Sequence, residues 1–241
     1  MQQVRFQDLG NRDYQEIWEY QEKLLKENVE IKAAASWKQE RGPFPELAHA
    51  AVETVHHLLL VEHPPVYTLG KSGKEENLLL NKEQLQQKGF GYYRINRGGD
   101  ITFHGPGQIV GYPVLDLEKF YTDLGRYLRS LEEVIILTMA DYGLKGERSP
   151  GETGVWMDAT IKGRERKICA MGIRCSRWIT MHGFAFNVNT NLDYFSYIIP
   201  CGIQDKQVTS LEKELGRKVD LEDVKNKLKK HFEHVFQVQL V

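Results

Sequence analysis

The segment Arg97–Gln108 constrains the fold most, because four glycines and a proline surround one short alternating run. Glycine clusters are tolerated mainly where the backbone needs a positive φ or where another group approaches it closely. Between the glycine pairs, residues 100–104 alternate polar with apolar side chains, which predicts a half-buried strand with one polar face. The sequence Gly-Pro-Gly at 105–107 then makes a rigid corner. We therefore expect this strand to form the wall of a cleft, although a solvent-facing strand between two turns would show the same alternation.

The composition narrows the class of protein. The chain has 241 residues, of which 41% are hydrophobic and 27% charged, so it can bury a sizeable core, and we expect a single domain over residues 1–241. A formal net charge of -1 argues against a general nucleic-acid binder. Three cysteines, an odd number, without a signal-peptide pattern indicate reduced thiols and a cytoplasmic location. No apolar run is as long as a membrane span, so no membrane is expected as a partner. Because of the net charge, no nucleic acid is expected either.

The N-terminal half predicts one helix and two short strands. An apolar stripe with helical spacing begins near Asp13 and reaches Leu25. The polar segment Lys26–Pro45 contains a glycine and two prolines, and we expect it to form a polar excursion outside the core. Apolar runs at 58–61 and 66–69, separated by two prolines, predict two strands joined by a bend.

The tripeptide Gly70-Lys71-Ser72 after the second strand is similar to the end of a phosphate-binding loop. That motif needs a glycine five residues before its second glycine, and Pro65 stands there. We therefore interpret the tripeptide as a turn that ends the strand.

The C-terminal half mixes helices and strands. A long helix is expected within Asp116–Gly143, three antiparallel strands at 154–157, 167–175 and 179–189, a short helix opening at Thr209, and a final helix from Asp220 to about Phe236. Because helices and strands do not alternate regularly, the pattern predicts an α+β fold with a mixed β-sheet flanked by helices.

One of the three cysteines is a candidate nucleophile. Cys201 follows an apolar run and lies between Pro200 and Gly202, where small neighbours would leave its sulfur reachable, although a buried free cysteine is the commoner case. Cys169 and Cys175 lie inside predicted strands and are expected to be packed. The three lack the paired spacing of a structural zinc site, so no metal is expected.

Lys167 is a candidate partner for a thiol, because it precedes an apolar strand that should be buried. A surface lysine is the alternative. A free thiol is only about 3% ionised at pH 7, and a neighbouring ammonium that lowers its pKa by about two units would make it mostly thiolate. Such a lysine can take the thiol proton and then stabilise the thiolate.

Several blocks of the chain resemble the lipoyl(octanoyl) transferase family. These blocks are residues 61–70, 97–99, 102–108, 154–156, 167–169, 181–189 and 200–202. The resemblance extends from about Leu58 to Leu211 and is specific, because the blocks occur in the family's order. Segment 26–45 and the lysine-rich C-terminal end depart from it.

The resemblance implies the fold of the biotin and lipoate protein ligases and a set of site residues. Cys201 would be the nucleophile that carries the acyl group as a thioester, and Lys167 would activate it. The implied acyl pocket is lined by Arg97, Gly98, Gly99, Asp100, Ile101, Thr102, Phe103, His104, Ala170, Met171, Gly172, Gly183, Phe184 and Ala185. Phe103 and Phe184 would supply apolar contact for a fatty chain.

The implied reaction is the first step of protein lipoylation. The enzyme would take an octanoyl group from acyl carrier protein and place it on a lysine of the lipoyl domains of 2-oxoacid dehydrogenase complexes and of the glycine cleavage H protein. A thioester donor already carries an activated acyl group, so no ATP and no cofactor are expected. An ATP-dependent lipoate ligase and a non-catalytic module that binds lipoyl domains are the alternatives.

The final helix carries four lysines, Lys225, Lys227, Lys229 and Lys230. They could steer an acidic partner such as carrier protein, because complementary charge raises encounter rates. An ordinary solvated helix face is the alternative.

Overall fold

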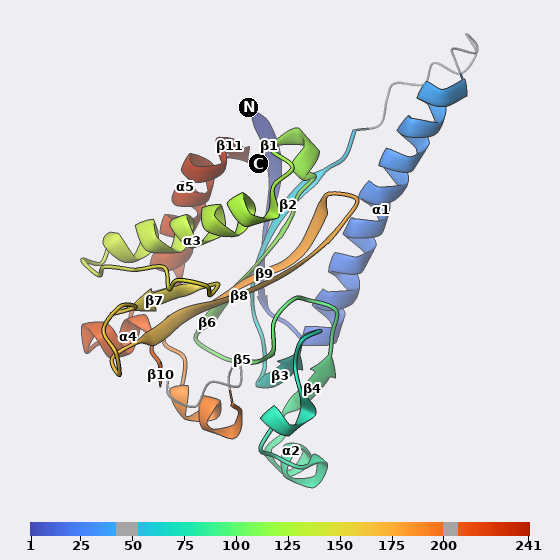
Figure 1. Cartoon of the computed structure of the whole chain (residues 1–241). Coiled ribbons are helices and arrows are strands. Elements are labelled where there is room, and N and C mark those ends of the chain that lie inside the picture. The colour runs from blue at the N-terminus through green and yellow to red at the C-terminus, as the bar shows by residue number, and fades with distance from the viewer. Residues whose placement is uncertain (42–52, 200–206) are drawn as a thin grey trace.

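The computed structural model describes residues 1–41, 53–199 and 207–241, and its main element is a large mixed β-sheet (Figure 1). The strand order is β10-β8-β9-β6-β2-β1-β11, and β7 pairs with β8. The bounds are β1 Gln2–Asn11, β2 His56–Glu62, β6 Gln108–Val114, β7 Val155–Met157, β8 Arg166–Ser176, β9 Ile179–Asn187, β10 Gln207–Val208 and β11 Val238–Leu240.

Both parallel and antiparallel pairs occur in this sheet. β1 runs parallel to β2 and to β11, and β10 runs parallel to β8. The central pairs β2–β6, β6–β9 and β8–β9 are antiparallel, as is β7–β8. A smaller sheet has the order β4-β3-β5, with β3 Val66–Leu69, β4 Gly91–Arg94 and β5 Ile101–His104. The predicted α+β class with a mixed sheet is confirmed.

Helices cover both faces of the large sheet (Figure 1). The helices are α1 Tyr14–Arg41, α2 Lys82–Lys88, α3 Leu124–Ala140, α4 Leu211–Leu215 and α5 Leu221–Phe236. Leu131 of α3 and Phe232 of α5 share one core with Leu58 and Leu60 of β2. Alternate residues of the same strand, such as Leu59, face a second core with the side chains of α1. The strand period of two thus supplies a separate core on each side of the sheet.

Two predicted element boundaries need correction. α1 continues to Arg41, so residues 26–41 of the predicted excursion are helical; they contain neither glycine nor proline, and Gly42 is the first helix breaker. Residues 42–45 lie outside the described residues. α3 lies within the predicted range Asp116–Gly143: it begins after its N-cap Asp123, and residues 117–119 form a separate 3-10 turn. The N-cap of α4 is Ser210 rather than Thr209.

The remaining predicted elements are confirmed. The two strands around the prolines are β2 and β3, and the alternating run is β5. The three-stranded meander is β7, β8 and β9, and α5 buries Val224, Leu228 and Phe232 as expected. Strands β1, β4, β6 and β11 have weaker hydrophobic alternation in the sequence and were not predicted from it.

Candidate active site

A pocket lies between the large and the small sheet, with walls from β5, β6, β8 and β9. Its cavity volume is about 100 Å³ and it opens to solvent. The lining residues are Tyr14, Arg97, Gly99, Asp100, Ile101, Thr102, His104, Gln108, Val110, Tyr112, Thr153, Lys167, Ala170, Met171, Gly172, His182, Gly183, Phe184, Ala185, Asn187, Phe195 and Val208.

Two facing glycines let neighbouring backbone approach the pocket wall. Gly172 of β8 pairs with Gly183 of β9. A Cβ on Gly183 would lie 2.2 Å from the carbonyl oxygen of Gly111, and one on Gly172 would lie 2.7 Å from that of Gly98. Real Cβ atoms do not approach backbone oxygens so closely. Any larger residue would therefore displace β6 or the 97–99 loop.

The 97–99 loop is held by backbone hydrogen bonds on both sides. The N–H of Gly98 donates to the Ile173 carbonyl at 2.9 Å. The N–H groups of Lys71 and Ser72 donate to the carbonyls of Arg97 and Gly99 at 2.9 and 3.1 Å. The Gly70–Ser72 tripeptide is thus a strand-ending turn, as interpreted, and two of its N–H groups bind this loop.

A chain of buried side chains runs along the pocket from β5 into β9. Nδ1 of His104 lies 2.9 Å from Oε1 of Gln108, whose amide nitrogen donates to Asn187 at 2.9 Å. Gln108 Oε1 is therefore an acceptor, and His104 carries its proton on Nδ1. Nε2 of His104 lies 3.4 Å from the Thr68 hydroxyl, which accepts a 3.0 Å hydrogen bond from Arg97.

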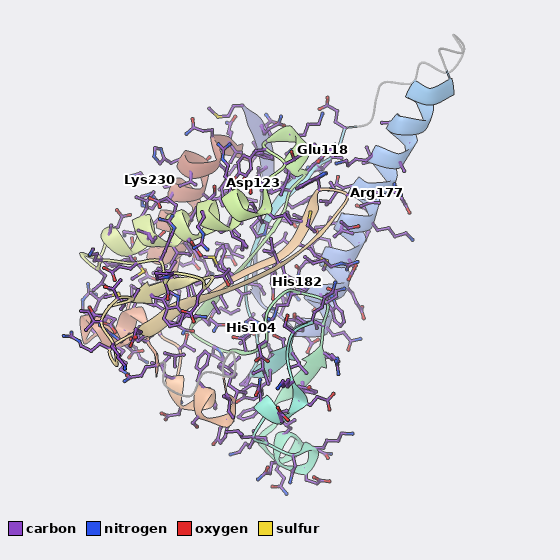
Figure 2. The ribbon with its side chains drawn as sticks, viewed as in Figure 1. His104, Glu118, Asp123, Arg177, His182 and Lys230 are labelled. Carbon is purple, nitrogen blue, oxygen red and sulfur yellow. The ribbon has the colours of Figure 1, made fainter. Side chains whose placement is uncertain are left out.

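Two further histidines lie close to the same pocket. His63 contacts Tyr112, which lines it, with 2.9 Å between Nε2 and the phenol oxygen. His182 lines the pocket and lies 2.9 Å from Asn96 through Nε2. Figure 2 shows His104 and His182 in the interior of the molecule.

Burial keeps these imidazoles neutral. Desolvation, followed by the charges of Arg97 and Arg174, lowers the pKa of His182 to about 3. Burial lowers the pKa of His63 to about 4, and it lowers that of His104 well below its ordinary value. At neutral pH all three rings therefore act as neutral donors and acceptors.

Most of the predicted acyl-binding residues line this one pocket, but two do not. Phe103 points to the opposite side of β5, where it packs in a core with Tyr67 and Phe195. Gly98 is not among the lining residues, and its backbone N–H donates to the Ile173 carbonyl of β8. Phe103 is therefore not part of the pocket lining, whereas Phe184 is. That the lining residues bind an acyl group stays a prediction.

Nine lining residues were not predicted from the sequence, and they come from many elements. They are Tyr14, Gln108, Val110, Tyr112, Thr153, His182, Asn187, Phe195 and Val208. Gln108 ends the glycine-rich stretch, and His182 and Asn187 lie in the 181–189 block, so those blocks contained a signal for them. Tyr14 and Phe195 come from a helix and a 3-10 turn whose sequences show only apolar spacing.

Lys167 lies at one end of the pocket lining, at the start of β8. Its ammonium lies 4.5 Å from the centre of the Trp156 ring on the paired strand β7, within the range of a cation–π contact. The lysine is partly exposed.

The described cysteines are both packed. Cys169 is fully buried, and desolvation raises the pKa of its thiol well above the ordinary value. Cys175 is half-buried, and burial raises its thiol pKa as well. Neither is an activated nucleophile. Cys201 lies outside the described residues.

Residues 1–41, 53–199 and 207–241 contain neither a metal-binding cluster nor a membrane-spanning helix. No group of three or more His, Cys, Asp or Glu side chains is placed to hold a metal ion. No helix in the same ranges is long and apolar enough to cross a membrane.

Comparisons with known proteins agree with the resemblance of the sequence blocks. Residues 13–233 match the family model of the lipoyl protein ligase A/B catalytic domain. The octanoyltransferase of Flavobacterium johnsoniae is 58% identical over 239 residues, which cover 99% of this chain and 98% of the relative. That of Christiangramia forsetii is 56% identical, over 99% and 97%.

A solved structure extends the comparison to the fold. A bipartite lipoate protein ligase from Thermoplasma acidophilum superposes with a TM-score of 0.69 at 15% identity, covering 100% of this chain and 86% of that one. Likeness at this identity concerns the fold alone. With more than half of its residues identical to octanoyltransferases over almost its full length, the chain belongs to the octanoyltransferases of the lipoyl protein ligase A/B catalytic family, and it is an acyltransferase.

Proposed function

We propose that this octanoyltransferase takes the octanoyl group from acyl carrier protein and transfers it to a lysine of a lipoyl domain through a thioester on Cys201. The observation that carries the proposal is a single pocket with Lys167 at one end and the apolar wall Ala170–Gly172 and Gly183–Ala185 beyond it. A medium-length acyl chain fits such a wall, with its carbonyl at the lysine.

The two packed cysteines support the choice of Cys201. A thiolate is the reactive form of cysteine, and burial suppresses it at Cys169 and Cys175. Cys201 is the third cysteine of the chain and stands in a family block. In the first half-reaction its thiol proton passes to Lys167, its sulfur bonds to the octanoyl carbon, and the carrier's sulfur leaves and is protonated.

In the second half-reaction the amine of the acceptor lysine attacks the thioester carbon. The amide bond forms and the carbon–sulfur bond breaks. Lys167, which gave its proton to the carrier's sulfur in the first half-reaction, takes up the proton that the amine loses, and Cys201 is released as thiolate beside the Lys167 ammonium. The acyl group is activated throughout, so no nucleotide takes part. The protein is proposed to work in the cytoplasm, where its carrier-protein donor would be found.

Incubation with octanoyl carrier protein alone tests the proposal. We expect intact-mass and peptide mass spectrometry to find one octanoyl group on Cys201, and a lipoyl domain added next to receive it without ATP. Cys201→Ala should abolish transfer, whereas Cys169→Ala and Cys175→Ala should not. Strict dependence on ATP with free octanoate would instead support a ligase, and binding of lipoyl domains without transfer would support a non-catalytic module.

Lys167→Ala separates the lysine's role from that of the cysteine. If the ammonium lowers the thiol pKa by about two units, its loss should slow acylation by roughly 10- to 100-fold at pH 7. Part of the rate should return at high pH, where the thiol ionises unaided. Loss of activity that is independent of pH would contradict the proposed role of Lys167 as activator.

A further inference from the structure

Trp156 lies opposite Lys167 because the pairing of β7 with β8 contains an irregularity. Val155 pairs with Cys169. The next residue, Trp156, pairs with Lys167, so the register shifts by one residue between the two pairs. A regular antiparallel register would instead place Met157 opposite Lys167. The irregularity is a β-bulge, a feature that often re-aims a side chain next to an active site, and here it sets an indole ring rather than a thioether beside the lysine.

The Trp156 ring contacts the ammonium of Lys167 directly. Nζ lies 4.5 Å from the centre of the ring. Cation–π contacts extend to about 6 Å from the ring centre, and tryptophan provides the strongest of them. A ring in this position favours the charged form of the amine and restricts a long, flexible side chain to few rotamers. The contact therefore acts on both the place and the charge of the lysine.

The ring is held on a fixed part of the fold. Trp156 is 2% exposed. Its N–H donates to the Glu147 carbonyl at 2.9 Å, and its carbonyl accepts from the Glu147 N–H at 2.8 Å. The Glu147 carboxylate in turn accepts from the Ala159 N–H at 3.0 Å. Trp156 is not among the residues that line the pocket, whereas Lys167 is. The ring therefore reaches the pocket through the lysine.

The backbone of Lys167 is fixed by strands on both sides. On one side it pairs with Trp156 of β7, and on the other with Val208 of β10. The Thr209 N–H donates to its carbonyl at 2.9 Å. The freedom that remains to this residue is in its side chain, which is the part that the ring contacts.

We propose that Trp156 is a positioning residue for acyl transfer, whose ring holds the Lys167 ammonium at the end of the pocket before a donor arrives. This inference rests on the proposed function, in which Lys167 activates the thiol of Cys201. Trp156 makes and breaks no bond and acts through the lysine alone. Without the ring the ammonium is spread over more rotamers, and its stabilisation of a thiolate weakens with distance.

The pH dependence of acylation tests this role. In single-turnover reactions with octanoyl carrier protein, Trp156→Leu should lower the acylation rate at neutral pH by about tenfold. Its acidic limb should move to higher pH, and the rate should approach that of the wild-type protein where the thiol ionises unaided. Trp156→Phe keeps a smaller ring in a similar fold and should lose only about threefold. An equal loss at every pH in folded Trp156→Phe would overturn the inference, because a purely structural defect has that signature.

A double-mutant cycle shows whether the ring acts through the lysine. Adding Trp156→Leu to the Lys167→Ala protein should change the remaining acylation rate by less than about twofold. A full additional tenfold loss would overturn the inference. Phe6→Leu is the matched control, since it removes the ring that lies 4.9 Å from the ammonium of Lys229, outside the pocket lining. It should leave the acidic limb in place, and a shift as large as that of Trp156→Leu would also overturn the inference.

Competitive acetylation separates this inference from the proposed function. Trace acetic anhydride labels the amines of the free protein and requires neither a donor nor Cys201. Peptide mass spectrometry should find that Trp156→Leu raises the acetylation of Lys167 by about fivefold relative to the exposed Lys230, because the amine is more accessible and less favoured as ammonium. Such a rise supports the contact even if transfer proves not to use Cys201. Unchanged acetylation removes the positioning role even if transfer occurs as proposed.

Discussion

Two buried polar clusters in this molecule differ in whether their hydrogen bonds are complete. Beneath α3, Glu132 is fully buried, and its carboxylate accepts from Arg129 at 2.6 Å, from Arg148 at 3.0 Å and from the Gly154 N–H at 3.0 Å. The pocket cluster contains three neutral histidines and leaves Nδ1 of His182 without a partner. Burial alone therefore does not distinguish a structural cluster from a functional one.

The difference indicates what each cluster is for. Glu132 joins α3, the 145–154 segment and the entry to β7, and a completed network of this kind stabilises the fold. An incomplete one costs stability, and this one lies beside the pocket. The first cluster therefore belongs to the scaffold, and we propose that the second takes part in substrate binding.

The largest expected effect is a loss in the free energy of unfolding at acid pH, caused by the buried histidines of the pocket cluster. The pKa values of His63 and His182 are lowered to about 4 and about 3, so below the ordinary value of about 6.5 the unfolded chain takes up protons that the native state refuses. Their stabilisation is complete above pH 6.5 and is lost as the pH falls toward those values. Together they should cost about 3 kcal/mol between pH 6.5 and 5.

Urea unfolding at pH 7.5, 6.5 and 5.0 measures this loss. His182→Asn should have a lower stability at pH 7.5 but a shallower dependence on pH, because one of the titrating groups is gone. Equal urea midpoints at pH 5.0 and 7.5 in the wild-type protein would contradict the neutral state of the buried rings.

Removing the scaffold carboxylate should affect stability rather than catalysis. Glu132→Ala leaves two arginines and one backbone N–H without their acceptor, and we expect a loss of about 3 kcal/mol in the free energy of unfolding. Glu132→Gln, which keeps an acceptor oxygen, should lose less. The kcat/KM per folded molecule should stay within about twofold in both variants, and a larger change would show that this cluster also acts in the site.

At His104, in contrast to Glu132, we expect a substitution to reduce catalysis more than stability. His104→Leu keeps a side chain of similar bulk but removes the donor to Gln108, which should cost about 1 kcal/mol of stability. Because the ring also lines the pocket, kcat/KM should fall about tenfold, which is about 1.4 kcal/mol. Chemical denaturation and steady-state kinetics on one preparation give both numbers. A drop in stability without a drop in kcat/KM would make His104 another scaffold residue.

The smallest effect should come from the C-terminal helix. Lys225 is buried and paired with Asp8 and Glu222, Lys227 is paired with Asp223, and Lys229 packs over Phe6. Lys230 is the exposed one of the four, and Figure 2 places it away from His104 and His182. Lys230→Gln should therefore change kcat/KM by less than about twofold at low salt. A larger loss in kcat/KM that disappears in high salt would support steering of an acidic partner by this helix.

Sequence patterns predicted those parts of the site that depend on local chemistry. Alternation over residues 100–104 predicted β5, and the glycines marked the places where backbone approaches the pocket. The same alternation places Phe103 on the face of β5 opposite His104, and in the structure Phe103 packs into a separate core.

Other features depend on contacts between distant segments. The length of α1 was underestimated because its second half is polar, and a polar helix looks like a loop when no tertiary contact is known. His182 stands among mainly apolar residues of β9. Its tautomer depends on Asn96 and Glu22, which no local pattern links to it.

The first and the last strand of the chain, β1 and β11, pair with each other at one edge of the large sheet. Val238 of β11 pairs with Gln2 of β1, in parallel, and the two ends of the chain lie close together in Figure 1. Contacts of such sequence separation carry the full entropy of loop closure and form late in folding. During synthesis β1 must therefore wait with one edge unpaired until α5 and β11 have left the ribosome, and this edge is where chaperones or aggregation would compete with the native fold.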